Sequence, residues 1–194
     1  MTTIILARHG ETDWNRERRW QGQSDPPLNE LGREQSRRLA DALADVPLAA
    51  VYSSDLQRAV ETATIVARRK GLPLAAVPEL REIDIGEWSG LTSEEIESRY
   101  PQNFRRLELT GRGWERGESY EQLGRRVLAA VERIAAAHAG EQVLVIGHGG
   151  AIRSVLAHAE GVDYLEHRRR SGGPLENCAL CRIAVEDGYV RRID

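Results

Sequence analysis

Hydrophobic residues recur along this chain with two periods, one typical of strands and one typical of helices. Short apolar runs predict buried strands, and apolar residues three or four positions apart predict amphipathic helices. The predicted elements alternate from one end of the chain to the other, as in layered α/β proteins. The predicted strands cover residues 3–7, 49–52, 74–77, 142–146, 178–185 and 189–193, and the predicted helices cover 29–46, 55–71, 92–100, 119–138 and 151–160.

Capping patterns indicate where two of the predicted helices begin. Asp55 is expected to cap the helix that stops at Gly71. Thr92 and Glu95 form a capping-box pattern at the start of the next helix. The stretch 79–91 between them has no regular period and is expected to be irregular.

The length of 194 residues suits one domain with a sizeable core, and we expect a single domain over residues 1–194. The 27 basic residues are balanced by 30 acidic ones, and the net charge of −3 provides no general attraction to nucleic acid or to acidic membranes. The first apolar run is too short for a signal peptide, and no stretch is apolar for long enough to cross a membrane. We therefore expect a cytoplasmic protein.

Three predicted strands run directly into unusual polar groups. Ligands of parallel α/β sheets bind beyond the carboxyl ends of the strands, so these groups are expected to converge in a cationic pocket that suits phosphate. Gly10 and Gly149 would let the backbone approach such a ligand closely. The groups are Arg8, His9 and Gly10 after the first strand, residues 53–55 with Arg58 after the second, and Gly147, His148 and Gly149 after the strand 142–146.

The order of these motifs resembles that of a known family. Residues 6–15 (Leu-Ala-Arg-His-Gly-Glu-Thr-Asp-Trp-Asn) are similar to the signature of the histidine phosphatase superfamily, in its phosphoglycerate mutase-like branch. The resemblance spans residues 3–153. The further blocks that match, in order, are 20–22, 25–28, 31–32, 52–59, 80–82 with Gly86 and Gly90, and 147–149.

The resemblance implies a three-layer α/β/α sandwich with a mostly parallel central sheet, in which residues about 90–120 form a cap-like insertion over the site. It implies that His9 is the nucleophile, which takes the phosphoryl group as a phosphohistidine intermediate. It also implies that Glu82 is the proton donor. The implied ligands are Arg8, Arg58 and His148 for the phosphate, Asn15 as a further polar contact to the phosphoryl group, and Gln21 and Gly22 in a substrate-facing loop.

The chemistry of phosphoryl transfer agrees with these roles. An imidazole must be neutral to attack phosphorus, and the guanidinium of Arg8 next to His9 lowers the pKa of that imidazole. Two guanidiniums and an imidazolium can stabilise the charge on the phosphoryl oxygens, so we expect no metal ion and no cofactor. The departing alkoxide needs a proton, which Glu82 can supply before it acts as a base toward water. The alternatives for this last role, which lie close by in the sequence, are Glu79, Asp84 and Glu87.

We expect a phosphatase that hydrolyses small phosphomonoesters, and two alternatives stay open. The first is a cofactor-dependent phosphoglycerate mutase. Family mutases carry an Arg-Arg pair followed by a proline-rich run, whereas Arg105 and Arg106 are followed by Leu-Glu-Leu, which favours hydrolysis. The second is a non-catalytic phosphate-binding or interaction module. The expected partner is a small phosphate ester, and not nucleic acid or a membrane; the natural substrate and the oligomeric state stay open, with a homodimer as one candidate.

Three further features allow both a structural and a functional interpretation. Cys178 and Cys181 have a C-x-x-C spacing, but without a second ligand pair or a strand-to-helix junction they are expected to be structural thiols rather than a redox or zinc site. The arginine run 168–170 is expected to be solvated, with a rim contact for an acidic substrate as the alternative. Core packing is favoured over ligand stacking for the tryptophans. The four tryptophans are Trp14, Trp20, Trp88 and Trp114.

Overall fold

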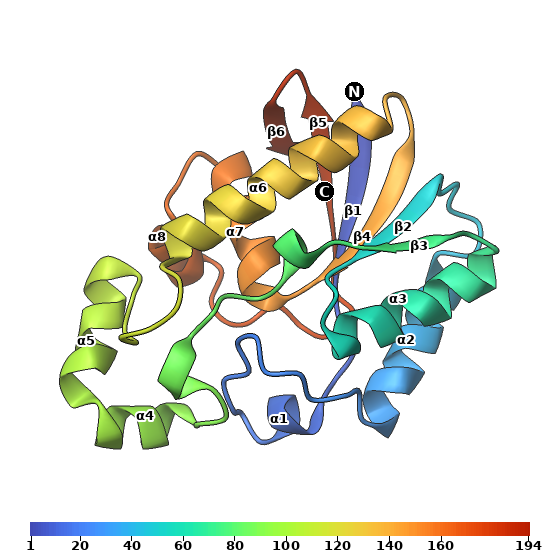
Figure 1. The fold of residues 1–194 in the computed structure, drawn as a ribbon. Coiled ribbons are helices and arrows are strands. Elements are labelled where there is room, and N and C mark those ends of the chain that lie inside the picture. Colours follow the sequence, from blue (N-terminus) through green and yellow to red (C-terminus); the bar gives the residue numbers. More distant parts are fainter.

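A computed structural model describes residues 1–194, which form a six-stranded sheet with helices on both faces (Figure 1). The strand order is β3-β2-β4-β1-β5-β6. The first four strands in this order are parallel, whereas β5 is antiparallel to β1 and β6 is antiparallel to β5. The strands are β1 (Thr2–Arg8), β2 (Ala50–Ser53), β3 (Leu74–Ala76), β4 (Gln142–Gly147), β5 (Leu180–Glu186) and β6 (Tyr189–Arg192).

The helices complete a three-layer α/β/α sandwich with a mostly parallel sheet, which confirms the fold expected from the sequence. In Figure 1, α2 and α3 lie on one side of the sheet, while α6 and α7 lie on the other. No helix combines the length and the apolar character that a membrane span requires. The helices are α1 (Asp13–Arg16), α2 (Glu30–Ala42), α3 (Gln57–Lys70), α4 (Ser93–Arg99), α5 (Pro101–Thr110), α6 (Tyr120–Ala137), α7 (Gly149–Ala159) and α8 (Tyr164–Arg170), with short 3₁₀ turns at Pro78–Leu80 and Gly86–Trp88.

The central strand β1 is apolar along its length because both of its faces are covered. Ile5 and Ala7 belong to the hydrophobic cluster under α2 and α3. Ile4 and Leu6 belong to the larger cluster on the other face, which includes α6 and α7. Successive side chains of a strand point to opposite faces, so such a strand is stable only between two helical layers.

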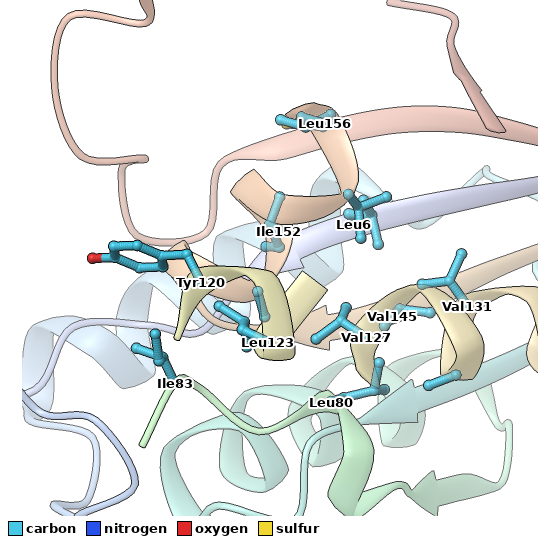
Figure 2. Close-up of a cluster of buried hydrophobic side chains, with 14 of the residues drawn as sticks. Leu6, Leu80, Ile83, Tyr120, Leu123, Val127, Val131, Val145, Ile152 and Leu156 are labelled. Carbon is cyan, nitrogen blue, oxygen red and sulfur yellow. The ribbon is translucent and has the colours of Figure 1, made fainter. Parts of the chain in front are cut away.

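The larger cluster packs β1 and β4 against α6 and α7. Figure 2 shows Leu6 of β1 and Val145 of β4 among apolar side chains from α6 and α7. Ile96 of α4 and Leu107 of α5 are buried in the same cluster. The segment 90–120 is therefore packed against the core through its apolar residues, although α4 and α5 lie far from the sheet in Figure 1.

The predicted elements are present, but one predicted cap is wrong. Asp55 does not cap α3, whose N-cap is Leu56 without a side-chain hydrogen bond. The carboxylate of Asp55 instead accepts from Arg81 Nε at 2.7 Å and from Arg81 Nη2 at 2.6 Å. The N–H of Gln57 donates to Asp25 Oδ1 at 2.6 Å. A bidentate, charge-assisted pair outweighs a single bond to a helix N–H, so Asp55 is diverted and another aspartate serves the helix start.

Three helices were not expected from the sequence. These helices, α1, α5 and α8, are short, and short helices depend on tertiary packing more than on their own residues. The capping box of Thr92 and Glu95 is confirmed at the start of α4. The segment expected to be irregular contains the two short 3₁₀ turns.

Candidate active site

The residues that follow β1, β2 and β4 meet at one edge of the sheet. Parallel pairing sets Arg8 of β1 opposite Gly147 of β4. The next residues, His9 and His148, therefore lie side by side, with ring centroids 5.2 Å apart. Arg58 in the first turn of α3 places its Nε 3.2 Å from Nε2 of His9. The fold thus gathers predicted site residues that are far apart in the sequence.

The imidazole of His9 is buried and held in one orientation. Its Nδ1 lies 2.7 Å from the carbonyl oxygen of Gly10. Because a carbonyl oxygen can only accept, Nδ1 carries the proton and Nε2 keeps a free electron pair. The backbone of Gly10 passes so close to that of Gly32 that a Cβ on Gly10 would collide with it, so only glycine fits at this position. The nitrogen with the free electron pair is therefore the one that faces Arg58.

The two histidines are uncharged at neutral pH. Burial, with further contributions from the positive charges of Arg58 and Arg8, holds the pKa of His9 well below its usual value of 6.5. Burial and the charge of Arg58 likewise lower the pKa of His148 well below that value. Burial also lowers the pKa of Arg58, to about 10, which leaves the guanidinium charged at neutral pH. The site combines a neutral imidazole with fixed positive charge.

Several buried polar atoms at this edge of the sheet have no hydrogen-bond partner in the protein. They are Nε of Arg8 and both ring nitrogens of His148. The carbonyl-type oxygen Oε1 of Gln21 is also buried without a partner. An unsatisfied buried polar group costs about 1–3 kcal/mol, so a cluster of them indicates a site that is completed by a polar ligand.

Arg58 is oriented by the loop that was expected to face the substrate. Its Nη1 donates to the carbonyl oxygen of Ser24 at 2.6 Å, and its Nη2 donates to that of Gly22 at 2.8 Å. Gly22 has a φ of +51°, and a Cβ there would also meet Ile85. Gln21 and Gly22 both line the cavity, but the contact that Gly22 makes is a carbonyl bond to Arg58. Ser24 acts in the same way and was not identified from the sequence.

Glu82 lies in the loop between the two 3₁₀ turns, and its carboxylate contacts the first turn of α7. Its Oε2 accepts the N–H of Gly150 at 2.9 Å, and its Oε1 accepts the N–H of Ile83 at 2.9 Å. A Cβ on Gly150 would collide with this carboxylate. The backbone of Glu82 is held by Arg126 of α6, whose Nη2 donates to the Glu82 carbonyl oxygen at 3.3 Å. The carboxylate is thus fixed between a loop and a helix N-terminus.

The alternative acidic residues face elsewhere. Glu79 pairs with Arg133 at 3.0 Å, Asp84 accepts the N–H of Gly86 at 3.0 Å, and Glu87 accepts the N–H of Glu115 at 2.6 Å. Glu82 lines the cavity and these three do not. The geometry favours Glu82 among the four.

These groups line a cavity of about 1040 Å³. Arg8, His9, Asn15, Arg58 and Gly149 lie on its wall. His148 is fully buried behind it, next to His9. Residues that sequence reasoning did not assign to the site also line it, and among them are Arg18, Arg19, Ser93, Tyr120, Arg153, Tyr164 and the segment 173–177. Arg153 could have been found from the sequence, since on the helix that follows the Gly-His-Gly motif it shares a face with Gly149.

The tryptophans divide into two pairs. Trp14 and Trp20 line the cavity, whereas Trp88 and Trp114 are fully buried in the larger core cluster. Of the arginine run 168–170, only Arg168 lines this cavity. Its guanidinium also pairs with Glu108 at 3.0 Å. The wall therefore presents aromatic surface and positive charge in addition to the residues expected to bind phosphate.

The two cysteines are free thiols. Burial raises the pKa of Cys178 to about 11 and also raises the pKa of Cys181. Both thiols stay protonated at neutral pH, which agrees with a structural role.

Comparison with known proteins identifies the family. The model of the histidine phosphatase superfamily (branch 1) matches residues 4–192. The chain belongs to this superfamily. It is 40% identical over 197 residues to the metal-independent phosphoserine phosphatase of Arabidopsis thaliana (96% of this chain, 78% of that protein). It is 36% identical over 192 residues to the probable phosphoglycerate mutase GpmB of Yersinia pestis (96% of this chain, 86% of that protein).

A solved structure has the same fold. Bacillus stearothermophilus YhfR superposes with a TM-score of 0.90 at 36% identity, covering 99% of this chain and 95% of that one. The resemblance seen in the sequence is thereby confirmed over nearly the whole chain. The membership and the phosphatase relatives show that the chain is a phosphoric monoester hydrolase.

Proposed function

We propose that the chain hydrolyses small phosphomonoesters without a metal ion, through a phosphohistidine formed at His9. The observation that carries this proposal is the orientation of that imidazole. Its Nδ1 is committed to Gly10, and its Nε2 faces Arg58 next to the unpartnered donors of Arg8 and His148. A nucleophile thus meets a set of donors suited to the oxygens of a phosphoryl group.

The first step transfers the phosphoryl group to His9. Without substrate, the N–H of Arg58 donates to Nε2. A phosphate oxygen placed between the two side chains would accept from Arg58, so the electron pair on Nε2 becomes free to attack phosphorus. A P–N bond forms while the P–O bond to the leaving group breaks, and Glu82 gives that oxygen its proton.

The second step returns the phosphoryl group to water. Glu82 is now ionised and takes a proton from the water molecule that attacks phosphorus. The P–N bond breaks, and His9 returns to its neutral form with inorganic phosphate as the product. Arg8 and Arg58 stay charged throughout, so they stabilise the phosphoryl oxygens in both steps.

Hydrolysis is favoured over mutase activity by the place of the Arg105-Arg106 pair. Neither residue lines the cavity, and Arg106 donates to the carbonyl oxygens of Arg112 and Gly113 within the segment 90–120. A mutase must hold the second anionic group of a bisphosphorylated acid, and this pair does not supply that contact. The similarity to GpmB keeps the mutase as the competing activity.

The wall indicates which leaving groups fit. Trp14 and Trp20 offer flat apolar surface, and the exposed Arg18 offers a positive charge. Such a wall suits a leaving group that carries both an apolar part and an acidic group. The proposed cap, residues about 90–120, contributes Ser93 and Tyr120 to this wall.

A turnover assay tests the proposal. Hydrolysis of p-nitrophenyl phosphate in EDTA should proceed at the rate seen without EDTA, and His9→Ala should abolish it. Rapid acid quench with phosphorus-labelled substrate should leave an acid-labile label on the wild-type chain. Turnover without this label, or a requirement for added metal, would overturn the mechanism. Interconversion of 2- and 3-phosphoglycerate, primed by the bisphosphate and faster than phosphate release, would establish the mutase instead.

A non-catalytic module would bind phosphate and turn over none of a panel of phosphate esters. The same panel identifies the natural substrate class. We also propose a homodimer and a cytoplasmic location. Size-exclusion chromatography with light scattering tests the dimer.

A further inference from the structure

The segment 171–177 lies in the connection between α8 and β5, and its residues 173–177 line the cavity of the site. Its residues 173–176 separate the active-site cavity from a neighbouring cavity of about 610 Å³. Nothing in the sequence motifs marks this segment, which lies beyond the last matching block. Its contacts nevertheless reach Arg8, His9 and Asn15.

The amide of Asn15 is oriented by three donors. Its Oδ1 accepts from the N–H and the hydroxyl of Thr12, both at 3.2 Å, and from Nδ2 of Asn177 at 3.3 Å. An amide turned by 180° would set its NH₂ group against two N–H donors, so this orientation is the stable one. Nδ2 of Asn15 is consequently left as a donor for a ligand in the cavity.

Asn177 is itself held by the nucleophile's backbone. The same Nδ2 donates to the carbonyl oxygen of His9 at 2.9 Å, so both of its protons are used. The N–H of the next residue, Cys178, donates to the carbonyl oxygen of Arg8 at 3.0 Å. These two bonds fix the distance between Asn177 and the end of β1, which carries His9.

The segment is also anchored by two arginines that line the cavity, Arg153 and Arg8. Arg153 of α7 is buried, and it donates to Ser171 Oγ at 2.9 Å and to the carbonyl oxygen of Gly173. Arg8 Nη1 donates to the carbonyl oxygen of Leu175, which leaves Nε of Arg8 as the unpartnered donor. The segment is thus held at several points, and the side chain of Asn177 bonds it to the backbone of His9.

We propose that Asn177 is a positioning residue, which keeps the amide of Asn15 turned so that its NH₂ group donates to the phosphoryl group. The inference rests on the proposed function, because it assigns Asn15 to the bound phosphoryl group. Asn177 acts through Asn15, and its bond to the His9 carbonyl serves as the anchor.

A double-mutant cycle tests this role with p-nitrophenyl phosphate as the probe. Asn177→Ala removes one of three donors to Asn15 and should lower kcat/KM by about tenfold. Asn15→Ala should lower it at least as much. The double variant should be no worse than Asn15→Ala within about twofold, since Asn177 has nothing left to orient. Losses that multiply in the double variant, or no loss in Asn177→Ala, would overturn the proposal.

A second variant separates orientation from packing. Asn177→Asp has the same shape but only acceptors, so it favours the turned amide of Asn15 and should lose more activity than Asn177→Ala. In the Asn15→Ala background this excess loss should disappear, and an excess loss that persists would show that charge alone acts. Thermal unfolding confirms that each variant is folded, and Asn103→Ala, which loses only a surface bond to Glu115, is the matched control with normal activity.

The proposed function and this inference fail differently. A wild-type chain that does not turn over p-nitrophenyl phosphate, or a His9→Ala variant that does, removes the proposed function and the inference with it. An active wild type and an inactive His9→Ala, together with losses that multiply across the cycle, remove the role of Asn177 alone.

Discussion

Replacement of Glu82 by glutamine separates its two proposed tasks. The carboxylate accepts two backbone N–H groups, from Ile83 and from Gly150, each at 2.9 Å. The glutamine amide has almost the same shape, but one of its two ends is a donor. It keeps the cavity wall filled while it removes both the proton donor of the first step and the base of the second.

The cost to stability follows from the lost acceptor. One N–H of the pair will face an NH₂ group, which costs about 1–3 kcal/mol. For a chain of this length each kcal/mol shifts Tm by about 2–4 °C, so Tm should fall by roughly 2–12 °C. Such a loss leaves the protein folded at 25 °C, since domains are stable by about 5–15 kcal/mol.

The cost to catalysis depends on the leaving group. An alkyl phosphate needs a proton from Glu82, and loss of a general acid lowers the rate by about 10²- to 10⁴-fold. p-Nitrophenolate leaves without protonation, so the first step survives in Glu82→Gln while hydrolysis of the phosphohistidine slows. Stopped-flow absorbance should therefore show a burst of about one p-nitrophenol per active site, followed by a slow steady state.

The matched control for this experiment is Glu79→Gln, because Glu79 pairs with Arg133 and does not line the cavity. This variant should show neither the burst nor the selective loss on alkyl phosphates. Equal losses on both substrate types in Glu82→Gln, without a burst, would refute the assignment of Glu82 as acid and base.

Three further predictions concern stability. His9 and His148 are buried, and their folded-state pKa values lie well below 6.5. The unfolded chain therefore binds protons that the folded chain does not, so the free energy of unfolding should fall as the pH drops below 6.5. Between pH 6.5 and 5.5 the fall should be about 1 kcal/mol per histidine. Urea unfolding at pH 6.5 and 5.5 measures this fall, which His148→Gln should reduce. An unchanged fall in that variant would contradict the prediction. Gly124→Ala on α6 should raise the free energy of unfolding by about 0.5–1 kcal/mol, since the added Cβ meets only Ser154 Cβ at 3.7 Å. A lower urea midpoint than that of the wild type would contradict this. Leu144→Ala in the fully buried centre of β4 should cost about 2–5 kcal/mol, and a loss under 1 kcal/mol would show that the core collapses around the gap.

Much of the layout could be read from local patterns. An apolar run such as residues 4–7 predicts a strand that is buried on both faces, and Arg8 and His9 at its end predict a polar site at the sheet edge. The positions of Arg58 and His148 follow from the same rule, because parallel strands bring their carboxyl ends together. These inferences succeed because the burial of a strand follows from its own residues, and because helices between successive strands favour parallel pairing.

Contacts between distant segments could not be read in this way. Asp55 satisfies every local condition for a helix cap, yet the guanidinium of Arg81 lies within reach in the fold and binds it instead. A contact with a distant segment likewise distinguishes Glu82 from its acidic neighbours, because its carboxylate accepts the N–H of Gly150.

The sequence by itself determined the layered architecture, the order of the strands' polar ends and the types of side chain available for phosphate chemistry, because these depend on periodicity and on short motifs. The tertiary structure alone decided which nitrogen of His9 is free, how the amide of Asn15 is turned and that Asn177 lies beside both of them. The physical reason is that a hydrogen bond requires two groups within about 3 Å in a defined direction. Packing of the whole chain sets such distances, and no local pattern encodes them.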